Sequence, residues 1–167
     1  DAPRIQDSAR AIAALDALAA LAETATINNY TKPHVHEGDE IQILEGRHPV
    51  VERRSTEAFV PNDTVLNGAT HQLVILTGPN MGGKSTYLRQ VAIVCLMAQA
   101  GSFVPARQAN LALVDRTFTR VGASCNIARG QSPLLVEMRE TANILPSATS
   151  RTLSTPARAA RGTATSP

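Results

Sequence analysis

Apolar residues recur at three- and four-residue intervals in two parts of the chain, and this spacing predicts two helices. The first runs over about residues 7–26 and carries one apolar stripe that needs a partner surface, formed by Ile5, Ile12, Leu15, Ala19 and Ala22. The second runs over residues 85–100 and stops before Gly101, the residue type expected just past a helix end.

The stretch between these helices alternates between loop-like and strand-like composition. "NNYTKPHVHEGDE", residues 28–40, is polar and is predicted to be a loop. "IQILEGRHPVVE", residues 41–52, predicts a short strand, a turn at Gly46 and a second short strand. "VPND" then predicts a turn, and "QLVILT", residues 72–77, predicts a buried strand that leads directly into a glycine-rich loop.

Composition narrows the class of protein. A length of 167 residues allows one domain with one core, and a net charge of +2 is too small by itself to indicate nucleic-acid binding. The two cysteines, Cys95 and Cys125, have neither a disulfide framework nor a zinc spacing, which favours a reducing compartment and the cytoplasm. The longest apolar run, residues 91–98, is far shorter than a membrane span, and no signal peptide is visible, so we expect no membrane partner.

"ILTGPNMGGKSTYLRQ", residues 75–90, holds the strongest chemical signal. It contains the spacing G-x-x-x-x-G-K-[ST], formed by Gly78, Gly83, Lys84 and Ser85. Glycines let backbone N–H groups close around phosphates, the helix N-terminus adds positive partial charge, and the lysine reaches the outer phosphate oxygens. The alternative is a glycine turn that merely joins a strand to a helix.

Other polar groups give weaker signals. His34 and His36 lie near three carboxylates, but no third ligand follows at a metal-binding spacing, so we predict a solvated loop there. His48 is interpreted as polar scaffolding rather than a base. Arg116 and Arg120 alternate on a candidate strand without forming a DNA-reading stripe.

Seven segments, "GRHPVVE", "FVPND", "LTGPNMGGKSTYLRQVA", "GSFVPA", "DRTFTRVGAS", "ARGQS" and "VEMRETANIL", follow one another as they do in the ATPase domain of the MutS family of DNA mismatch-recognition proteins. The resemblance covers about residues 8–145. It implies an α/β fold with an incomplete P-loop NTPase core of the ABC type. Residues 1–30 would be the end of the family's lever helix, and residues 31–145 would be the N-terminal part of its ATPase domain.

The resemblance also implies roles for residues. Asn80 would lie near the γ-phosphate, and Ser85 would bind Mg²⁺. The loop that resembles the family's phosphate loop, and would hold ATP or ADP, consists of Gly78, Pro79, Asn80, Met81, Gly82, Gly83, Lys84, Ser85 and Thr86.

Two further residues have competing interpretations. Phe59 resembles the aromatic residue that stacks on adenine, and its alternative is an ordinary core phenylalanine. Ser132 resembles the signature serine that reaches the γ-phosphate of the partner subunit's ATP; alternatively it only caps a helix that Pro133 begins. The family usually has Ser-Thr-Phe where this chain has "SPL", and Asp where it has Cys125, so the contact in trans is expected to be weaker.

The segment 146–167 departs from the family. Leu153 is its only large apolar residue, a composition typical of disorder. When "ARGTATS" is aligned with the family's Gly-Arg-Gly-Thr, the two Walker B carboxylates fall on Ala157 and Arg158. An arginine cannot activate water, so no catalytic residue is predicted, and a strand with two prolines is not expected to pair. A frameshifted reading is one hypothesis, and resequencing the gene would test it.

The resemblance implies that a longer protein binds mismatched double-stranded DNA, self-dimerises, engages a MutL-type partner and uses ATP to switch to a sliding clamp. Such a protein would be cytoplasmic and nucleoid-associated. The alternative is a nucleotide-binding module that cannot hydrolyse ATP. A small P-loop kinase is disfavoured, because the family segments occupy the place of its lid and acceptor pocket.

Overall fold

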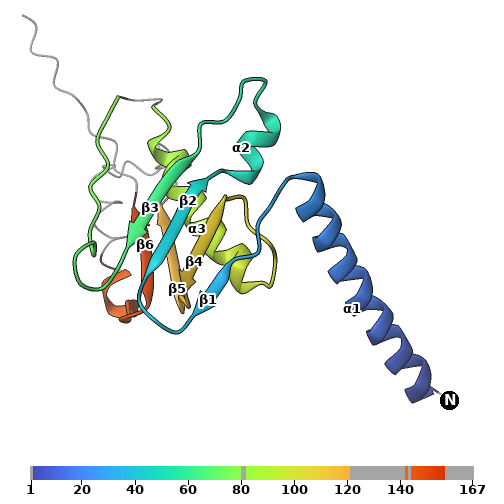
Figure 1. Ribbon diagram of the computed structural model, residues 1–167. Helices are drawn as coiled ribbons and strands as arrows, with labels where there is room; N and C mark the ends of the chain where they lie inside the picture. Colours follow the sequence, from blue (N-terminus) through green and yellow to red (C-terminus); the bar gives the residue numbers. More distant parts are fainter. Residues whose placement is uncertain (1, 80–81, 121–141, 143, 157–167) are drawn as a thin grey trace, which may run out of the picture.

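A four-stranded sheet forms the centre of the molecule in the computed structural model, which describes residues 2–79, 82–120, 142 and 144–156. The strand order is β1-β4-β2-β3, with β2 antiparallel to both neighbours and β1 parallel to β4 (Figure 1). The fold is therefore mixed α/β, as predicted. The strands are β1 (His34–His36), β2 (Ile41–Gly46), β3 (Asn62–Leu66) and β4 (Gln108–Ala112).

A second sheet pairs β5 (Arg116–Arg120) with β6 (Thr152–Pro156) in parallel, and a short 3-10 helix, η2 (Leu145–Ser147), precedes β6. The predictions of disorder and of an unpaired strand are therefore wrong for residues 152–156. Leu153 and Thr155 alternate and are both buried, which stabilises this pairing. Pro156 ends the strand, where a missing N–H costs least.

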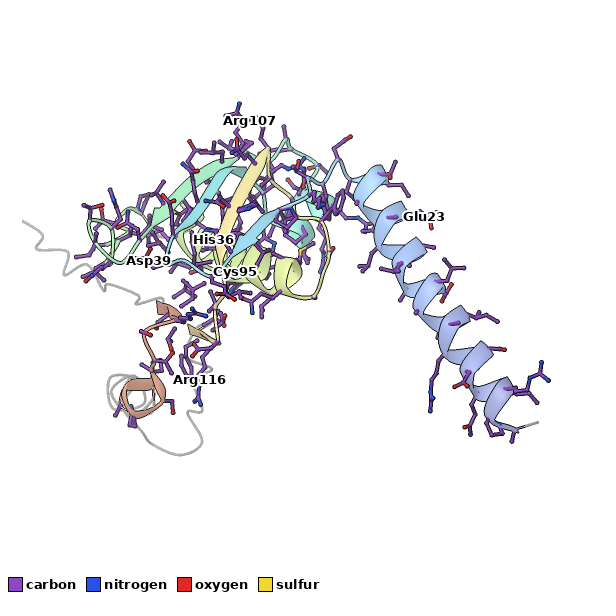
Figure 2. The ribbon with its side chains drawn as sticks, turned by 60° about the horizontal axis from the view of Figure 1, so that its bottom comes forward. Glu23, His36, Asp39, Cys95, Arg107 and Arg116 are labelled. Atoms are coloured by element: carbon purple, nitrogen blue, oxygen red, sulfur yellow. The ribbon has the colours of Figure 1, made fainter. Side chains whose placement is uncertain are left out.

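The core lies between the four-stranded sheet and α3 (Lys84–Gln99), which confirms the predicted second helix and its stop at Gly101. Its fully buried large side chains include Ile43 and Leu111 from the sheet and Val94 from the helix. Cys95 lies on the same buried face of α3 (Figure 2), and burial raises the pKa of its thiol to about 12.

The first predicted helix is also confirmed, as α1 (Ala2–Ile27), and it stands away from the body of the molecule, meaning the two sheets with α2 and α3 (Figure 1). Within α1, which the structure describes in full, only Ala25 is buried. The apolar stripe is exposed, as Ile5, Ile12 and Leu15 show. None of the helices in the described part of the chain is long and apolar enough to span a membrane.

The second short strand predicted after Gly46 is wrong, because residues 49–54 form the helix α2 (Pro49–Arg54). His48 caps this helix: its Nδ1 atom accepts hydrogen bonds from the backbone N–H groups of Val50 and Val51. Pro49 has a φ angle suited to the first helical turn, and Glu52 complements its dipole. These local signals outweigh the β propensity of the two valines.

The buried strand predicted over residues 72–77 is not formed. Residues 73–79 have no regular structure, and Leu73 and Ile75 are 79% and 78% exposed. No described strand pairs with this segment, and an unpaired strand cannot satisfy its backbone groups. Instead β3, which begins inside the predicted "VPND" turn, forms the edge of the sheet next to β2.

Candidate functional site

Two glycines shape the loop that precedes α3. Gly78 has a φ of 146° and Gly83 a φ of 78°, values that side chains with a Cβ rarely adopt. An added Cβ would meet no atom within 4 Å at either position, so the backbone conformation rather than crowding requires glycine there. The Gly82 N–H donates to the Pro79 carbonyl at 3.2 Å.

Lys84 begins α3 and folds back onto this loop. Its Nζ atom donates to the carbonyl oxygens of Gly78 and Pro79. The first intrahelical bond runs from the Tyr87 N–H to the Gly83 oxygen, so the preceding N–H groups have no acceptor within the helix. An ammonium group and N–H groups without an intrahelical acceptor therefore meet at one helix end, which suits an anion.

Two polar anchors that sequence reasoning missed fix α3 to neighbouring segments of the body. The Tyr87 hydroxyl accepts from Thr64 Oγ1 at 2.9 Å and donates to the Asp63 carbonyl, tying the first turn to β3. Gln99 exchanges two hydrogen bonds with the backbone of Val114 at the other end. Tyr87 stands one turn before Val91, so helical spacing could have placed it on the buried face.

A buried polar contact lies between α3 and the end of β2. The Gln90 side chain is fully buried, and neither of its polar atoms has a hydrogen-bond partner among the described residues. Gly46 makes room for it, since a Cβ at Gly46 would come within 2.7 Å of Gln90 Nε2. Nearby, His48 is buried; desolvation lowers its pKa, and the positive charge of Arg89 acts in the same direction.

The structure brings together the loop residues Gly78, Pro79 and Gly82 and the start of α3. Ser85 is exposed there, and Thr86 is half-buried. Phe59 is half-buried in the segment before β3 and is not part of the hydrophobic core, so its alternative as an ordinary core residue gains no support. The other predicted site residues, and Cys125, lie outside the described residues: Asn80, Met81, Ser132, Ala157 and Arg158.

His34 and His36 lie on β1 rather than in the predicted loop. Their rings stack with centroids 5.8 Å apart, His34 Nδ1 pairs with Asn110 Oδ1, and His36 Nδ1 accepts from the Gly38 N–H. In the ranges that the structure describes, no group of three or more His, Cys, Asp or Glu side chains could hold a metal ion. The histidines therefore support the sheet edge.

A cavity of about 860 Å³ opens beside α3, separate from the glycine loop. Its walls come from α3, β3, β6 and the exposed segment 73–76, and they include Leu76, Tyr87, Val91 and Leu153. Protein interiors rarely leave spaces of this size between apolar side chains. The segment 73–76 borders this space with side chains that are exposed.

Comparison with known proteins connects this geometry to one family. The family model described as MutS domain V matches residues 74–167. The chain is 57% identical over 163 residues to the DNA mismatch repair protein MutS of Ruminiclostridium cellulolyticum, covering 97% of this chain and 19% of that protein. The proteins of the same name from Alkaliphilus metalliredigens and Acetivibrio thermocellus are each 55% identical, with 97% of this chain and 18% and 19% of those proteins covered. The chain thus spans about a fifth of the length of these relatives.

Proposed function

Because the chain belongs to the MutS family, as the match to its domain V and the similarity to three MutS proteins show, we propose that the loop over residues 78–86 binds the phosphates of ATP or ADP. The observation that carries this proposal is the meeting of Lys84, two positive-φ glycines and the N-terminus of α3 at one place. For this chain we propose an incomplete P-loop NTPase core of the ABC type.

Nucleotide binding requires one rearrangement in the loop. Lys84 now donates to the carbonyl oxygens of Gly78 and Pro79, so its ammonium group must turn from them toward the incoming phosphates. Phosphate oxygens are stronger acceptors than carbonyls, since they carry a formal charge. The exposed hydroxyl of Ser85 would bind Mg²⁺, which supplies the charge neutralisation that phosphate binding needs.

We propose the wider function for the longer protein of which this chain corresponds to about a fifth. That protein binds mismatched double-stranded DNA, forms dimers, engages a MutL-type partner and switches to a sliding clamp with ATP. The names of the relatives, DNA mismatch repair protein MutS, support this proposal. In it Phe59 stacks on adenine, and Ser132 reaches the nucleotide of the partner subunit.

A second proposal concerns turnover: this chain binds nucleotide but does not hydrolyse it. Its support is the alignment that places Ala157 and Arg158 where the family's acidic pair stands. Hydrolysis requires a group that orients or deprotonates water, and neither side chain does this. Purified chain that releases phosphate steadily, and stops when Lys84 is replaced by alanine, would refute this proposal.

The binding proposal is tested by titrating a fluorescent ADP analogue with Mg²⁺ into the parent chain and into Lys84→Ala. Losing charge-assisted hydrogen bonds of about 1.5–3 kcal/mol should weaken binding roughly 10- to 100-fold. Lys32 is exposed and lies outside the loop, so Lys32→Ala is a matched control that should bind like the parent. Equal affinities for all three proteins would contradict the assignment of the loop.

A further inference from the structure

The joint between α1 and the body is built around one arginine. The α1 helix ends in a left-handed turn: Asn29 has a φ of 52°, and the Tyr30 N–H donates to the Ala25 carbonyl at 2.9 Å. This bond closes the helix end in a Schellman motif and leaves the carbonyls of Asn28 and Asn29 pointing onward. They lie just past the negative end of the helix dipole, where a cation is favoured.

The Arg47 guanidinium meets those carbonyls. Its Nη2 atom donates to the Asn29 oxygen at 2.9 Å and to the Asn28 oxygen at 3.3 Å, and its Nη1 atom donates to Glu52 Oε1 at 3.0 Å. The Arg47 and Glu52 side chains are only 21% and 27% exposed. A planar, fork-shaped donor that serves a carboxylate and two helix-end carbonyls fixes three elements at one point.

The backbone at the same place connects this joint to the segment after α3. The Arg47 N–H donates to the Pro105 carbonyl at 2.8 Å, and Thr31 and Val104 exchange two backbone hydrogen bonds. Val104 and Pro105 are fully buried, so they give this attachment a rigid base. The end of α1, the start of α2 and the segment leaving α3 therefore meet around Arg47.

Among the residues that the structure describes, little else holds α1 in place. Ala25 is its one buried residue, and the rest of the helix extends away from the body with side chains such as Glu23 pointing into open space (Figure 2). A helix of 26 residues is about 39 Å long, so a small rotation at its base moves its far end by many ångströms. The contacts at the joint must therefore set its direction.

We propose that Arg47 is a positioning residue that fixes the direction in which α1 leaves the body, with Glu52 holding the guanidinium in place. This inference does not depend on nucleotide binding. In this proposal the segment "GRHPVVE" joins α1 to the body. Arg47 donates hydrogen bonds to carbonyls at the end of α1, while His48 and Pro49 start the helix that supplies Glu52.

The test measures the distance between spin labels on α1 and α3, by pulsed electron resonance and without nucleotide. Labels are placed at Ala14→Cys and Leu96→Cys, both exposed helix positions, in a Cys125→Ser background; burial and its raised thiol pKa protect Cys95 from labelling. The parent should give one narrow distribution of distances. Arg47→Met should broaden it about twofold, because a hinge without its restraint samples several directions.

Arg107→Met is the matched control. Arg107 also pairs with a glutamate, Glu45, at 2.9 Å, but it projects from the body away from α1 (Figure 2). Its loss should leave the distribution narrow. Thermal unfolding of each variant shows whether the body stays folded, so a change in direction is separated from a change in stability.

Two outcomes overturn the proposal: a folded Arg47→Met variant with a distribution as narrow as the parent's, or equal broadening by Arg107→Met. If Arg47→Met does not fold, Arg47→Lys replaces it, because an ammonium group keeps the charge beside Glu52 but lacks the fork geometry. Broadening in Arg47→Lys then supports the proposal, and a parent-like distribution overturns it. Since nucleotide is absent throughout, no result here depends on the loop at Lys84.

Discussion

Two apolar segments of similar composition have opposite surroundings in this molecule. "IQIL", residues 41–44, lies in β2 between β3 and β4, with Ile41 and Ile43 buried. "LVIL", residues 73–76, lies in no sheet, and all four residues are exposed. Both segments are rich in residues that favour strands, so local propensity does not explain the difference.

Pairing explains it. β2 exchanges backbone hydrogen bonds with a strand on each side, so every apolar side chain on its inner face meets α3 or the core. The segment 73–76 has no such neighbour in the described part of the chain, and it borders a cavity instead of filling it. A strand is a property of a pair of segments, and one segment of the pair does not reveal whether the other is available.

The largest expected effect comes from trimming one isoleucine in each segment. Ile43 is fully buried, so Ile43→Ala should lower the free energy of unfolding by about 2–5 kcal/mol through lost burial and a new cavity. Ile75 is 78% exposed, and Ile75→Ala should change it by less than about 0.5 kcal/mol. Urea unfolding followed by circular dichroism measures both.

Equal losses of unfolding free energy in Ile43→Ala and Ile75→Ala would contradict the difference between the two segments. They would mean that the segment 73–76 is packed in solution and contributes to the core. A loss at Ile43 alone would sharpen it, because the two side chains are chemically identical and differ only in their surroundings.

A smaller effect is expected at the end of the paired strand. In Gly46→Ala the new Cβ would lie 2.7 Å from Gln90 Nε2 and 2.8 Å from Ile43 Cγ2, so the core must shift. Overpacking of this kind costs about 1–3 kcal/mol. In a double variant with Gln90→Ala the cost should be less than the sum of the single costs, since one of the two clashes is gone. Strict additivity in urea unfolding would show that Gly46 and Gln90 do not interact.

The smallest expected effect concerns pH. Burial lowers the pKa of His48 below its ordinary value of 6.5, so the unfolded chain takes up this proton more readily than the folded one. The contribution of His48 to stability is therefore complete above pH 6.5 and is lost as the pH falls from 6.5 through the lowered folded pKa. Protonation also removes the Nδ1 acceptor that caps α2.

His48→Asn isolates this contribution, because asparagine caps helices but does not titrate in this range. Urea unfolding at a series of pH values should show a shallower loss of stability on the acid side than in the parent. The other histidines titrate in both proteins, so parallel pH profiles would exclude His48 as a source of the dependence.

Sequence reasoning found the features that local chemistry determines. The helices α1 and α3 and the stop of α3 at Gly101 follow from spacing alone, and they agree with the structure; the partner surface expected for the apolar stripe of α1 is not found among the described residues. The strands are harder to predict: the sequence predicts a loop where β1 forms and a turn where β3 begins. It also predicts a strand where α2 forms, although His48 and Pro49 are good helix starters. The strand prediction for residues 72–77 is wrong for a different reason: whether this segment forms a strand depends on a neighbouring strand to pair with.

The same division holds for the candidate site. Gly78, Gly83 and Lys84 could be identified from their spacing, because each is required by the conformation or charge of the loop itself. The contact of Tyr87 with Thr64, and the joint made by Arg47, could not be identified, since they connect residues whose proximity only the fold creates.

The burial of Cys95 makes its reaction with a thiol reagent a measure of how often the core opens. Its thiol lies beneath the sheet on α3 and resists ionisation, so a thiol reagent reaches it only when the helix separates from the strands. In a Cys125→Ser background, with enough reagent that modification is faster than reclosing, the rate of modification would equal the rate of these openings. The native thiol therefore reports the opening of the core, and no cysteine has to be introduced.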